Sequence, residues 1–333
     1  MDGQFRKRRV TVVSLGGTIA SSNSTGENGV KPSLSGEELV KNVKGLQEIA
    51  DVETISFRLK PSADLTFSDL TSAATRISEI LDSDADGVVV TQGTDTIEET
   101  SFFFDLVINS SKPVVVTGAM RNPTSISSDG DLNLLEAVLV ATSSQSKEAG
   151  ILVVMNGEIH LAPFVQKTNT QNVSTFKSPS LGPVGWISEG KVRFMLKPAY
   201  RRIHLPLSNG KEPTIPIVKS VLGDDGIIFK ALREEDIQGL IIEATGGGHV
   251  SSSVADFVQE YGKSIPIILC SRTGSGEVLT QTYSFKGSEI DLINKGVIPG
   301  GILSSVKARI LLYLLIKNEY NLQRIAESIQ QWL

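Results

Sequence analysis

The sequence predicts an α/β protein with two domains: a larger N-terminal domain, whose mostly parallel sheet is flanked by helices, and a smaller C-terminal α/β domain. Short runs of apolar and β-branched residues alternate with helical periodicity along the 333 residues. Several of these runs are apolar at every position, which is typical of strands covered on both faces and therefore of a parallel sheet.

Eight strands are predicted from these runs. They lie at 10–15, 55–60, 87–91, 113–117, 151–155, 215–219, 239–244 and 265–270. Cys270, the single cysteine of the chain, ends the last run. It has no partner for an internal disulfide, and we expect it to be buried like a small apolar side chain.

Helices are predicted between the strands, and two of them begin with a capping pattern. Ser35 precedes Glu38, and Thr66 precedes Asp69, by the three residues that a capping box requires. The predicted helices cover 35–49, 66–83, 96–110, 131–146 and, as two helices, 304–333.

The alternation is interrupted once, at residues 196–216. This stretch is rich in proline, polar and only weakly periodic. We therefore predict a linker there, between an N-terminal catalytic domain at 1–195 and a C-terminal domain at 217–333.

The composition favours a globular protein that acts on small molecules. The net charge is −5, without a long run of either sign. The basic cluster at 6–9 is interpreted as a solvated tail, so nucleic acid is not an expected partner. The apolar run at 310–316 is far shorter than the roughly 20 residues that a membrane span needs. With no secretory signal pattern at the N-terminus, we expect a cytoplasmic protein that does not bind membranes.

Neither a metal nor a cofactor is expected. The three histidines, at 160, 204 and 249, are far apart, and none belongs to a helical H-x-x-x-H pair. A Ser-His-Asp triad would lack the G-x-S-x-G elbow that hosts its serine. Residues 185–192 nearly match a phosphate-binding loop, but Val192 stands where serine or threonine is required.

Two predicted strands end in loops of glycine and hydroxyl residues. Residues 16–18 (GGT) follow the first strand, and residues 91–96 (TQGTDT) follow the third. Ligands bind at the carboxyl ends of parallel strands, and glycine lets the backbone approach them closely. Thr94 and Asp95 begin a helix, where backbone N–H groups favour a substrate carboxylate or a developing oxyanion. A turn and an ordinary N-cap explain the same residues, so both interpretations stay open on spacing alone.

The sequence resembles the bacterial-type L-asparaginase/glutaminase family in several motifs that occur in order along nearly the whole chain. SLGGTIAS at 14–21 is similar to the first signature of that family. VVVTQGTDTIEET at 88–100 is similar to the second, with Gln92 where the family usually has histidine. Further matches lie at 112–134, 165–179 and 304–309.

The resemblance implies catalytic roles for four residues. Thr18 would be the nucleophile that attacks the amide carbonyl, and Thr94, Asp95 and Lys167 would form a second interacting group. A threonine hydroxyl must lose its proton as it attacks. A lysine takes or relays that proton while a carboxylate orients it. An acyl-enzyme would form on Thr18, and water would then hydrolyse it.

The expected substrate-binding residues are Ser62, Ala63, Gly93, Asp95 and Tyr283. Ser62 falls where the family holds the substrate α-carboxylate, although a turn serine after a proline explains it equally well. Ala63 departs from the family, which usually has a glutamine there to hold the substrate α-ammonium. Asp95 would then have to hold an amine alone.

Further departures concern the mobile loop and the C-terminal domain. The tyrosine that contacts the nucleophile in the family is absent from 21–36, where Gly29 lies near its position. The family's asparagine and the glutamate lent by a neighbouring subunit have no counterpart in ATGGGHV (244–250) and TQTYSF (280–285). A buried ammonium without an acceptor is costly, so we expect free L-asparagine to bind poorly or the substrate to be N-blocked. Tyr283 would either stack on a less polar substrate or supply the missing phenol.

The expected function is therefore an asparaginase-like amidohydrolase with a threonine nucleophile, acting on L-asparagine, glutamine or a modified relative. The alternative is a catalytically weak relative that serves as a small-molecule binding or regulatory protein. The resemblance also implies a homotetramer of two tight dimers, with active sites shared between subunits.

Overall fold

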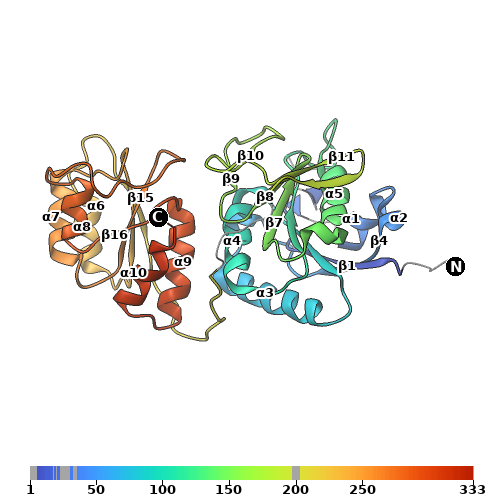
Figure 1. Cartoon of the computed structure of the whole chain (residues 1–333), viewed down its shortest axis with the longest axis horizontal. Coiled ribbons are helices and arrows are strands. Elements are labelled where there is room, and N and C mark those ends of the chain that lie inside the picture. Colours follow the sequence, from blue (N-terminus) through green and yellow to red (C-terminus); the bar gives the residue numbers. More distant parts are fainter. Residues whose placement is uncertain are drawn as a thin grey trace. The chain divides into compact units, whose positions relative to one another are not determined.

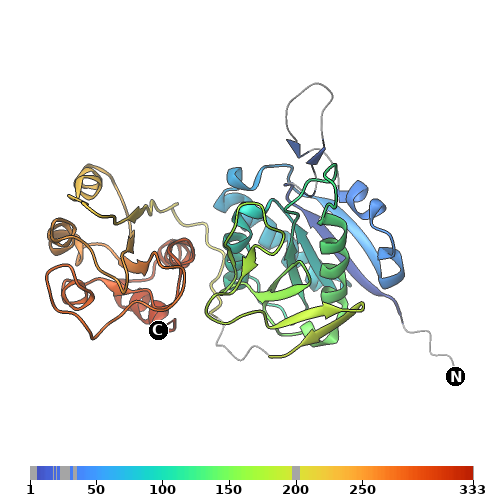
Figure 2. The same cartoon turned by 90° about the horizontal axis from the view of Figure 1, so that it is seen from above.

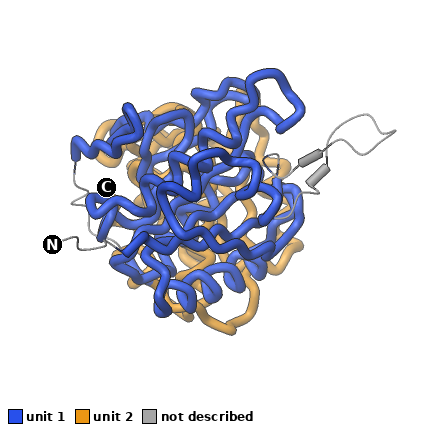
Figure 3. The backbone as a smooth tube through the Cα atoms, turned by 90° about the vertical axis from the view of Figure 1, so that its right-hand side faces the viewer, with its two compact units in different colours: residues 1–204 blue, residues 205–333 orange. Residues whose placement is uncertain are grey.

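The structure is a computed structural model that describes residues 6–17, 19, 21–22, 31–32, 36–196 and 203–332. The chain divides into two compact units, residues 1–204 and 205–333 (Figure 3). This boundary lies inside the segment 196–216 that was predicted as a linker. The limits given for the two domains stay a prediction.

The first unit contains an eight-stranded mixed sheet with the order β12-β11-β8-β7-β6-β5-β1-β4. Its parallel part consists of β4 (Ala50–Ser56), β1 (Arg8–Ser14), β5 (Gly87–Thr91), β6 (Val114–Thr117) and β7 (Ile151–Met155). Antiparallel strands extend it on one side: β8 (Glu158–Leu161), β11 (Gly185–Ser188) and β12 (Lys191–Phe194). Small antiparallel pairs are formed by β2 (Ser21–Ser22) with β3 (Lys31–Pro32) and by β9 (Gln166–Lys167) with β10 (Phe176–Lys177).

Helices cover both faces of this sheet (Figures 1 and 2). On one face lie α1 (Gly36–Asn42), α2 (Leu46–Ile49) and α5 (Gly130–Thr142), whose apolar side chains form one buried cluster with valines of β1, β5 and β6. On the other face lie α3 (Phe67–Asp82) and α4 (Ile97–Val107). The buried apolar runs of the sequence thus form a parallel sheet between two helical layers, as predicted.

The second unit is a smaller layered domain around a parallel sheet of order β13-β14-β15-β16. Its strands are β13 (Ile217–Lys219), β14 (Leu240–Ala244), β15 (Ile267–Ser271) and β16 (Ile298–Pro299), and its helices are α6 (Ile227–Ala231), α7 (Ser252–Tyr261), α8 (Glu289–Asn294), α9 (Ser305–Lys317) and α10 (Leu322–Gln330). Figure 1 shows α9 and α10 on the face opposite to α6, α7 and α8. Cys270 is fully buried on β15, and burial raises the pKa of its thiol. No helix in the described part of the chain is long and apolar enough to cross a membrane.

Several predicted elements differ from the observed ones. The strand predicted at 55–60 is wrong, because β4 covers 50–56 and the N–H groups of Phe57 and Arg58 then both donate to the carbonyl of Ser14, at 2.9 and 3.1 Å. The helix predicted at 35–49 is divided into α1 and α2, because Gly45 adopts a φ of 81°. The strands β2, β3, β8 to β12 and β16 were not predicted. The remaining observed strands, apart from β4, differ from their predicted limits by at most two residues at either end.

The capping pattern at the start of α3 is confirmed. The Thr66 side chain accepts the N–H of Asp69, and the Asp69 side chain accepts the N–H of Thr66. Ser35, the corresponding residue of the first predicted helix, lies outside the described residues. This capping box lies directly after the segment 57–65, which connects β4 to α3.

His160 on β8 is fully buried beside a serine and a carboxylate. Its Nδ1 lies 3.0 Å from Ser178 Oγ, and its Nε2 lies 3.3 Å from the Glu158 carboxylate, which also binds Lys177 Nζ at 2.9 Å. Burial lowers the pKa of His160 to about 4, despite the nearby Glu158. Ser178 is buried as well, so this Ser-His-Glu contact is a packing interaction and not an accessible nucleophile.

We expect the free energy of unfolding to fall as the pH falls from about 6.5 towards about 4, because the unfolded histidine binds a proton in this range and the buried His160 does not. The contribution of His160 to this fall is at most about 3 kcal/mol. Denaturant titrations across the range measure the slope. His160→Gln should flatten it, because the glutamine side chain does not titrate. An unchanged slope in His160→Gln would contradict the prediction.

Candidate functional site

The loop after β1 is packed by backbone contact between two other loops at the carboxyl edge of the sheet. A Cβ at Gly16 would lie 2.6 Å from the carbonyl oxygen of Lys60, and a Cβ at Gly17 would overlap the backbone nitrogen of Gly93. The two glycines also have φ values of 99° and 91°. Only glycine combines a positive φ with the absence of a Cβ. Gly16 and Gly17, the two residues before Thr18, therefore pass between the loops at 60–62 and 92–93. Thr18 itself lies outside the described residues.

The loops at 60–62 and 92–93 are in turn in contact with each other. A Cβ at Gly93 would lie 2.7 Å from Ser62 Oγ. The carbonyl of Ser62 accepts the hydroxyl hydrogen of Thr96 at 3.1 Å. Ser62 is 5% exposed, whereas the next residue, Ala63, is exposed and offers a methyl group where the family has an amide. The two predicted loops thus meet each other and the segment at 60–62 where parallel strands end, as expected of a ligand site in an α/β sheet.

Asp69 holds the segment that carries Ser62. Its carboxylate accepts hydrogen bonds from Arg58 Nε and Lys60 Nζ, both at 2.8 Å, and from the backbone N–H and hydroxyl of Thr66, at 3.1 and 2.9 Å. Burial alone would raise the pKa of Asp69, but the hydrogen bonds from Lys60, Arg58 and Thr66 hold it well below its usual range. Asp69 was predicted only as part of a helix cap, and its second role as the anchor of this loop was missed.

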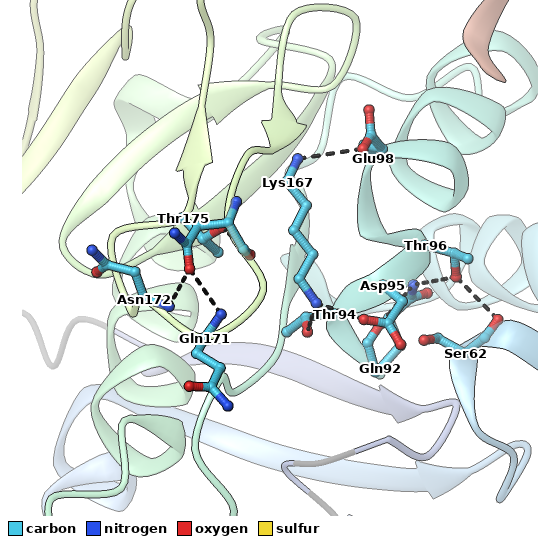
Figure 4. Close-up of polar contacts among 12 residues, drawn as sticks. Ser62, Gln92, Thr94, Asp95, Thr96, Glu98, Lys167, Gln171, Asn172 and Thr175 are labelled. Carbon is cyan, nitrogen blue, oxygen red and sulfur yellow. Dashed lines mark hydrogen bonds and ion pairs between the residues drawn. The ribbon is translucent and has the colours of Figure 1, made fainter. Parts of the chain in front are cut away.

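Lys167 reaches the site from the β9–β10 hairpin (Figure 4). Its Nζ donates to Thr94 Oγ1 at 2.9 Å and to Asp95 Oδ1 at 2.5 Å. Its backbone N–H donates to Glu98 Oε1 at 3.3 Å, which fixes the start of the side chain against α4. The ammonium is therefore held between a hydroxyl and a carboxylate on the loop after β5. The sequence analysis named Thr94, Asp95 and Lys167, and the structure brings these three together; it missed Glu98.

The hairpin loop beyond Lys167 is held by its own hydrogen bonds. Asn169 N–H donates to Thr175 Oγ1, and this hydroxyl donates back to the carbonyl of Asn169, both at 2.6 Å. Asn169 Oδ1 also accepts the N–H groups of Gln171 and Asn172 at 2.9 Å (Figure 4). A loop ordered in this way limits the positions that the Lys167 side chain can take.

The site is open on one side and closed on the other. The Lys167 side chain is 14% exposed, whereas that of Asp95 is 70% exposed. Thr94 is buried at the start of the short 3-10 helix Thr94–Thr96 that leads into α4. A hollow of about 330 Å³ adjoins this pair, lined by Asp95, Glu98, Lys167 and residues 168–170. A buried hydroxyl and a half-solvated ion pair thus lie next to a space large enough for a small molecule.

Tyr283 lies in the second unit, on the loop before α8. Its ring packs edge-on against His249, with centroids 4.9 Å apart, and also faces Phe285. The fully buried Glu289 accepts the N–H groups of Thr282 and Tyr283, at 2.8 and 2.6 Å, and lies 3.1 Å from His249 Nε2. Burial would raise the pKa of Glu289, but these hydrogen bonds lower it. His249 and Glu289 therefore hold the loop that carries Tyr283, and the sequence analysis missed both.

Within the described residues, no three His, Cys, Asp or Glu side chains converge in a way that could hold a metal ion. The polar groups of the site are a hydroxyl, an ammonium and carboxylates. This set is suited to proton transfer and to binding of a polar ligand.

The chain matches known proteins along nearly its whole length. The family described as "Asparaginase, N-terminal" matches residues 9–200, and that described as "Glutaminase/Asparaginase C-terminal domain" matches residues 214–329. The sequence is 35% identical to the L-asparaginase of Bacillus licheniformis over 314 residues, which cover 93% of this chain and 95% of that relative. It is 33% identical to L-asparaginase 2 of Escherichia coli (strain K12) over 330 residues, 97% of this chain and 93% of the relative.

The fold is similar to that of a solved structure as well. The probable cytoplasmic L-asparaginase from Campylobacter jejuni superposes with a TM-score of 0.88 at 30% identity. The match covers 97% of this chain and 99% of the other.

The close contact at Gly17 leads to a stability prediction. We expect Gly17→Ala to lower the free energy of unfolding by at least about 2 kcal/mol, because its Cβ would overlap the backbone of Gly93 in addition to straining φ. Gly45→Ala is the matched control, since Gly45 has a φ of 81° with no atom within 4 Å of the added Cβ. Denaturant titration of both variants measures the difference, and equal losses would refute the contact.

Proposed function

Because the chain belongs to the asparaginase family, we propose that it hydrolyses a small carboxamide through an acyl-enzyme formed on Thr18. The substrate is L-asparagine, L-glutamine or a modified, N-blocked relative. Thr94, Lys167 and Asp95 serve as the proton relay, and Ser62 binds the substrate carboxylate.

The proposed reaction has two halves. In the first, Thr18 Oγ attacks the amide carbon, its proton passes to the relay, and the tetrahedral intermediate collapses as the protonated amine leaves. In the second, water attacks the resulting ester, gives one proton to the relay, and releases the acid while the hydroxyl of Thr18 is restored. The relay gains and loses one proton in each half, so it is unchanged after one turnover.

The contact of Lys167 Nζ with both Thr94 Oγ1 and Asp95 Oδ1 is the observation that carries the proposal. Asp95 balances the charge of the lysine and fixes its direction, while Thr94 provides the hydroxyl through which a proton can pass. Gly17, the residue before Thr18, also supports the proposal, because its backbone packs against Gly93 on the loop that carries Thr94.

The substrate-binding side supports a modified substrate. Ser62 and Gly93 are in close contact beside the relay, and the exposed carboxylate of Asp95 can bind an amine. Ala63 provides no acceptor for an ammonium, and Tyr283 lies near the position where the family has a glutamate, in a stretch without a carboxylate. Replacing these acceptors by a methyl group and a phenol favours substrates whose α-nitrogen is acylated and uncharged.

A cytoplasmic location and a homotetramer with shared active sites are part of the proposal. The Campylobacter jejuni relative, named as cytoplasmic, supports the first. Sedimentation analysis of the purified chain measures the second.

We expect Thr18→Ala and Lys167→Met each to lower the rate of ammonia release by at least about a hundredfold, because one removes the nucleophile and the other the relay. Lys177→Met is the matched control; this lysine pairs with Glu158 and should leave the rate within a factor of a few. Mass spectrometry of the quenched wild type should detect an acyl group on Thr18. Binding without turnover in the wild type would favour the alternative, a binding or regulatory protein.

We expect N-acetyl-L-asparagine to be hydrolysed with a higher kcat/KM than L-asparagine, because no acceptor replaces the family's glutamine and glutamate. Ammonia release from L-asparagine, D-asparagine, L-glutamine and their N-acetyl derivatives measures this preference. Ala63→Gln should shift it towards the free amino acid. Tyr283→Phe tests the phenol: unchanged turnover would mean that Tyr283 acts only by stacking.

A further inference from the structure

Gln92 is a fully buried polar side chain at the candidate site, and the proposed reaction does not use it. It follows β5 directly, and its backbone N–H donates to the carbonyl of Thr117 on β6 at 3.1 Å. Its side chain lies below the turn that carries Thr94 and Asp95 (Figure 4).

The donor end of Gln92 links two loops. Its Nε2 donates to the carbonyl of Gly93 at 3.3 Å and to Thr96 Oγ1 at 3.4 Å. The hydroxyl of Thr96 donates its single hydrogen to the carbonyl of Ser62 at 3.1 Å. A chain of hydrogen bonds, Gln92 to Thr96 to Ser62, therefore connects the loop after β5 with the segment before α3.

The acceptor end of Gln92 is unsatisfied. Its Oε1 is buried and has no hydrogen-bond partner among the described residues. A buried acceptor without a donor destabilises the folded state, so an apolar side chain of similar size would be tolerated at least as well. Turning the amide over would bring Oε1 against the carbonyl of Gly93, acceptor against acceptor, so the observed orientation is the better one. Stability therefore does not account for a glutamine at this position.

We propose that Gln92 is a positioning residue that acts through Thr96 to set Ser62 relative to Thr94 and Asp95. This inference rests on the proposed function, in which Ser62 binds the substrate carboxylate. The coupling is tight because a Cβ at Gly93 would lie only 2.7 Å from Ser62 Oγ, so a small shift of either loop moves the other. The amide does not titrate in the working pH range, so this link does not change with pH.

Gln92→Met tests the inference, because it keeps the size of the side chain and removes its donors. The melting temperature should equal or exceed that of the wild type. The KM should be measured for whichever of L-asparagine and N-acetyl-L-asparagine the wild type hydrolyses with the higher kcat/KM. It should rise about tenfold, because about that much affinity is lost with one hydrogen bond, and kcat should change less. β-Alaninamide is L-asparagine without its α-carboxylate, and its N-acetyl derivative corresponds to N-acetyl-L-asparagine in the same way. The KM of the matching amide should not rise in the variant. Where that amide is not hydrolysed, its Ki as an inhibitor should likewise stay unchanged.

Two further variants separate positioning from general loosening. Thr96→Val breaks the same chain of hydrogen bonds at its middle. The double variant Gln92→Met/Thr96→Val should therefore have a KM no higher than that of the more impaired single variant. Ser146→Ala removes a buried hydrogen bond of 2.7 Å to Val140, before β7, and should lower the melting temperature without changing KM.

A lower melting temperature for Gln92→Met, an equal loss with the carboxylate-free amide, or additive effects with Thr96→Val would each overturn the inference. A wild type that is inactive on every amide would refute the proposed function instead. The comparison of melting temperatures would then still test Gln92.

Discussion

Backbone contact between three loops at the carboxyl edge of the first sheet is the constraint on which the candidate site depends. Gly16 lies against Lys60, Gly17 against Gly93, and Gly93 against Ser62, at distances that leave no room for a Cβ. Each loop limits the position of the next, so the site is held by the main chain instead of by flexible side chains. Asp69 completes the arrangement, because its hydrogen bonds hold the outer loop on the start of α3.

The ionic part of the site comes from elsewhere in the chain and is added to this frame. Lys167 arrives on the β9–β10 hairpin, which connects the antiparallel strands β8 and β11, more than seventy residues after Asp95. Its ammonium is largely shielded while the partner carboxylate faces solvent. A shielded cation beside a hydroxyl suits proton transfer, whereas a solvated carboxylate remains available to a ligand. In the proposed function, chemistry and recognition are thus divided between the buried and the exposed side of one ion pair.

The departures from the family lie in the expected recognition residues, at Ala63 and Tyr283, and also beside the expected chemistry, at Gln92 and near Gly29. Thr94, Asp95 and Lys167 keep the family pattern and lie together, whereas Ala63 is an exposed methyl group and Tyr283 belongs to an aromatic cluster with His249. Glu289 is fully engaged with that loop and its backbone, so it supports Tyr283 and does not replace the absent glutamate.

The sequence by itself determined the parallel sheet and the loops at its carboxyl edge, and it named Thr94, Asp95 and Lys167, whose side chains lie together, because continuous apolar runs and ordered motifs are local properties of the chain. It did not determine the end of β4 or the strands β8, β11 and β12, because the extent of these strands depends on pairing with a neighbour. Tertiary structure alone decided that Asp69 anchors the Ser62 loop, that Gln92 has a buried acceptor without a donor, and that His160 stays neutral. Each of these depends on how the folded chain places other residues around a polar atom, and a local sequence pattern does not show that placement.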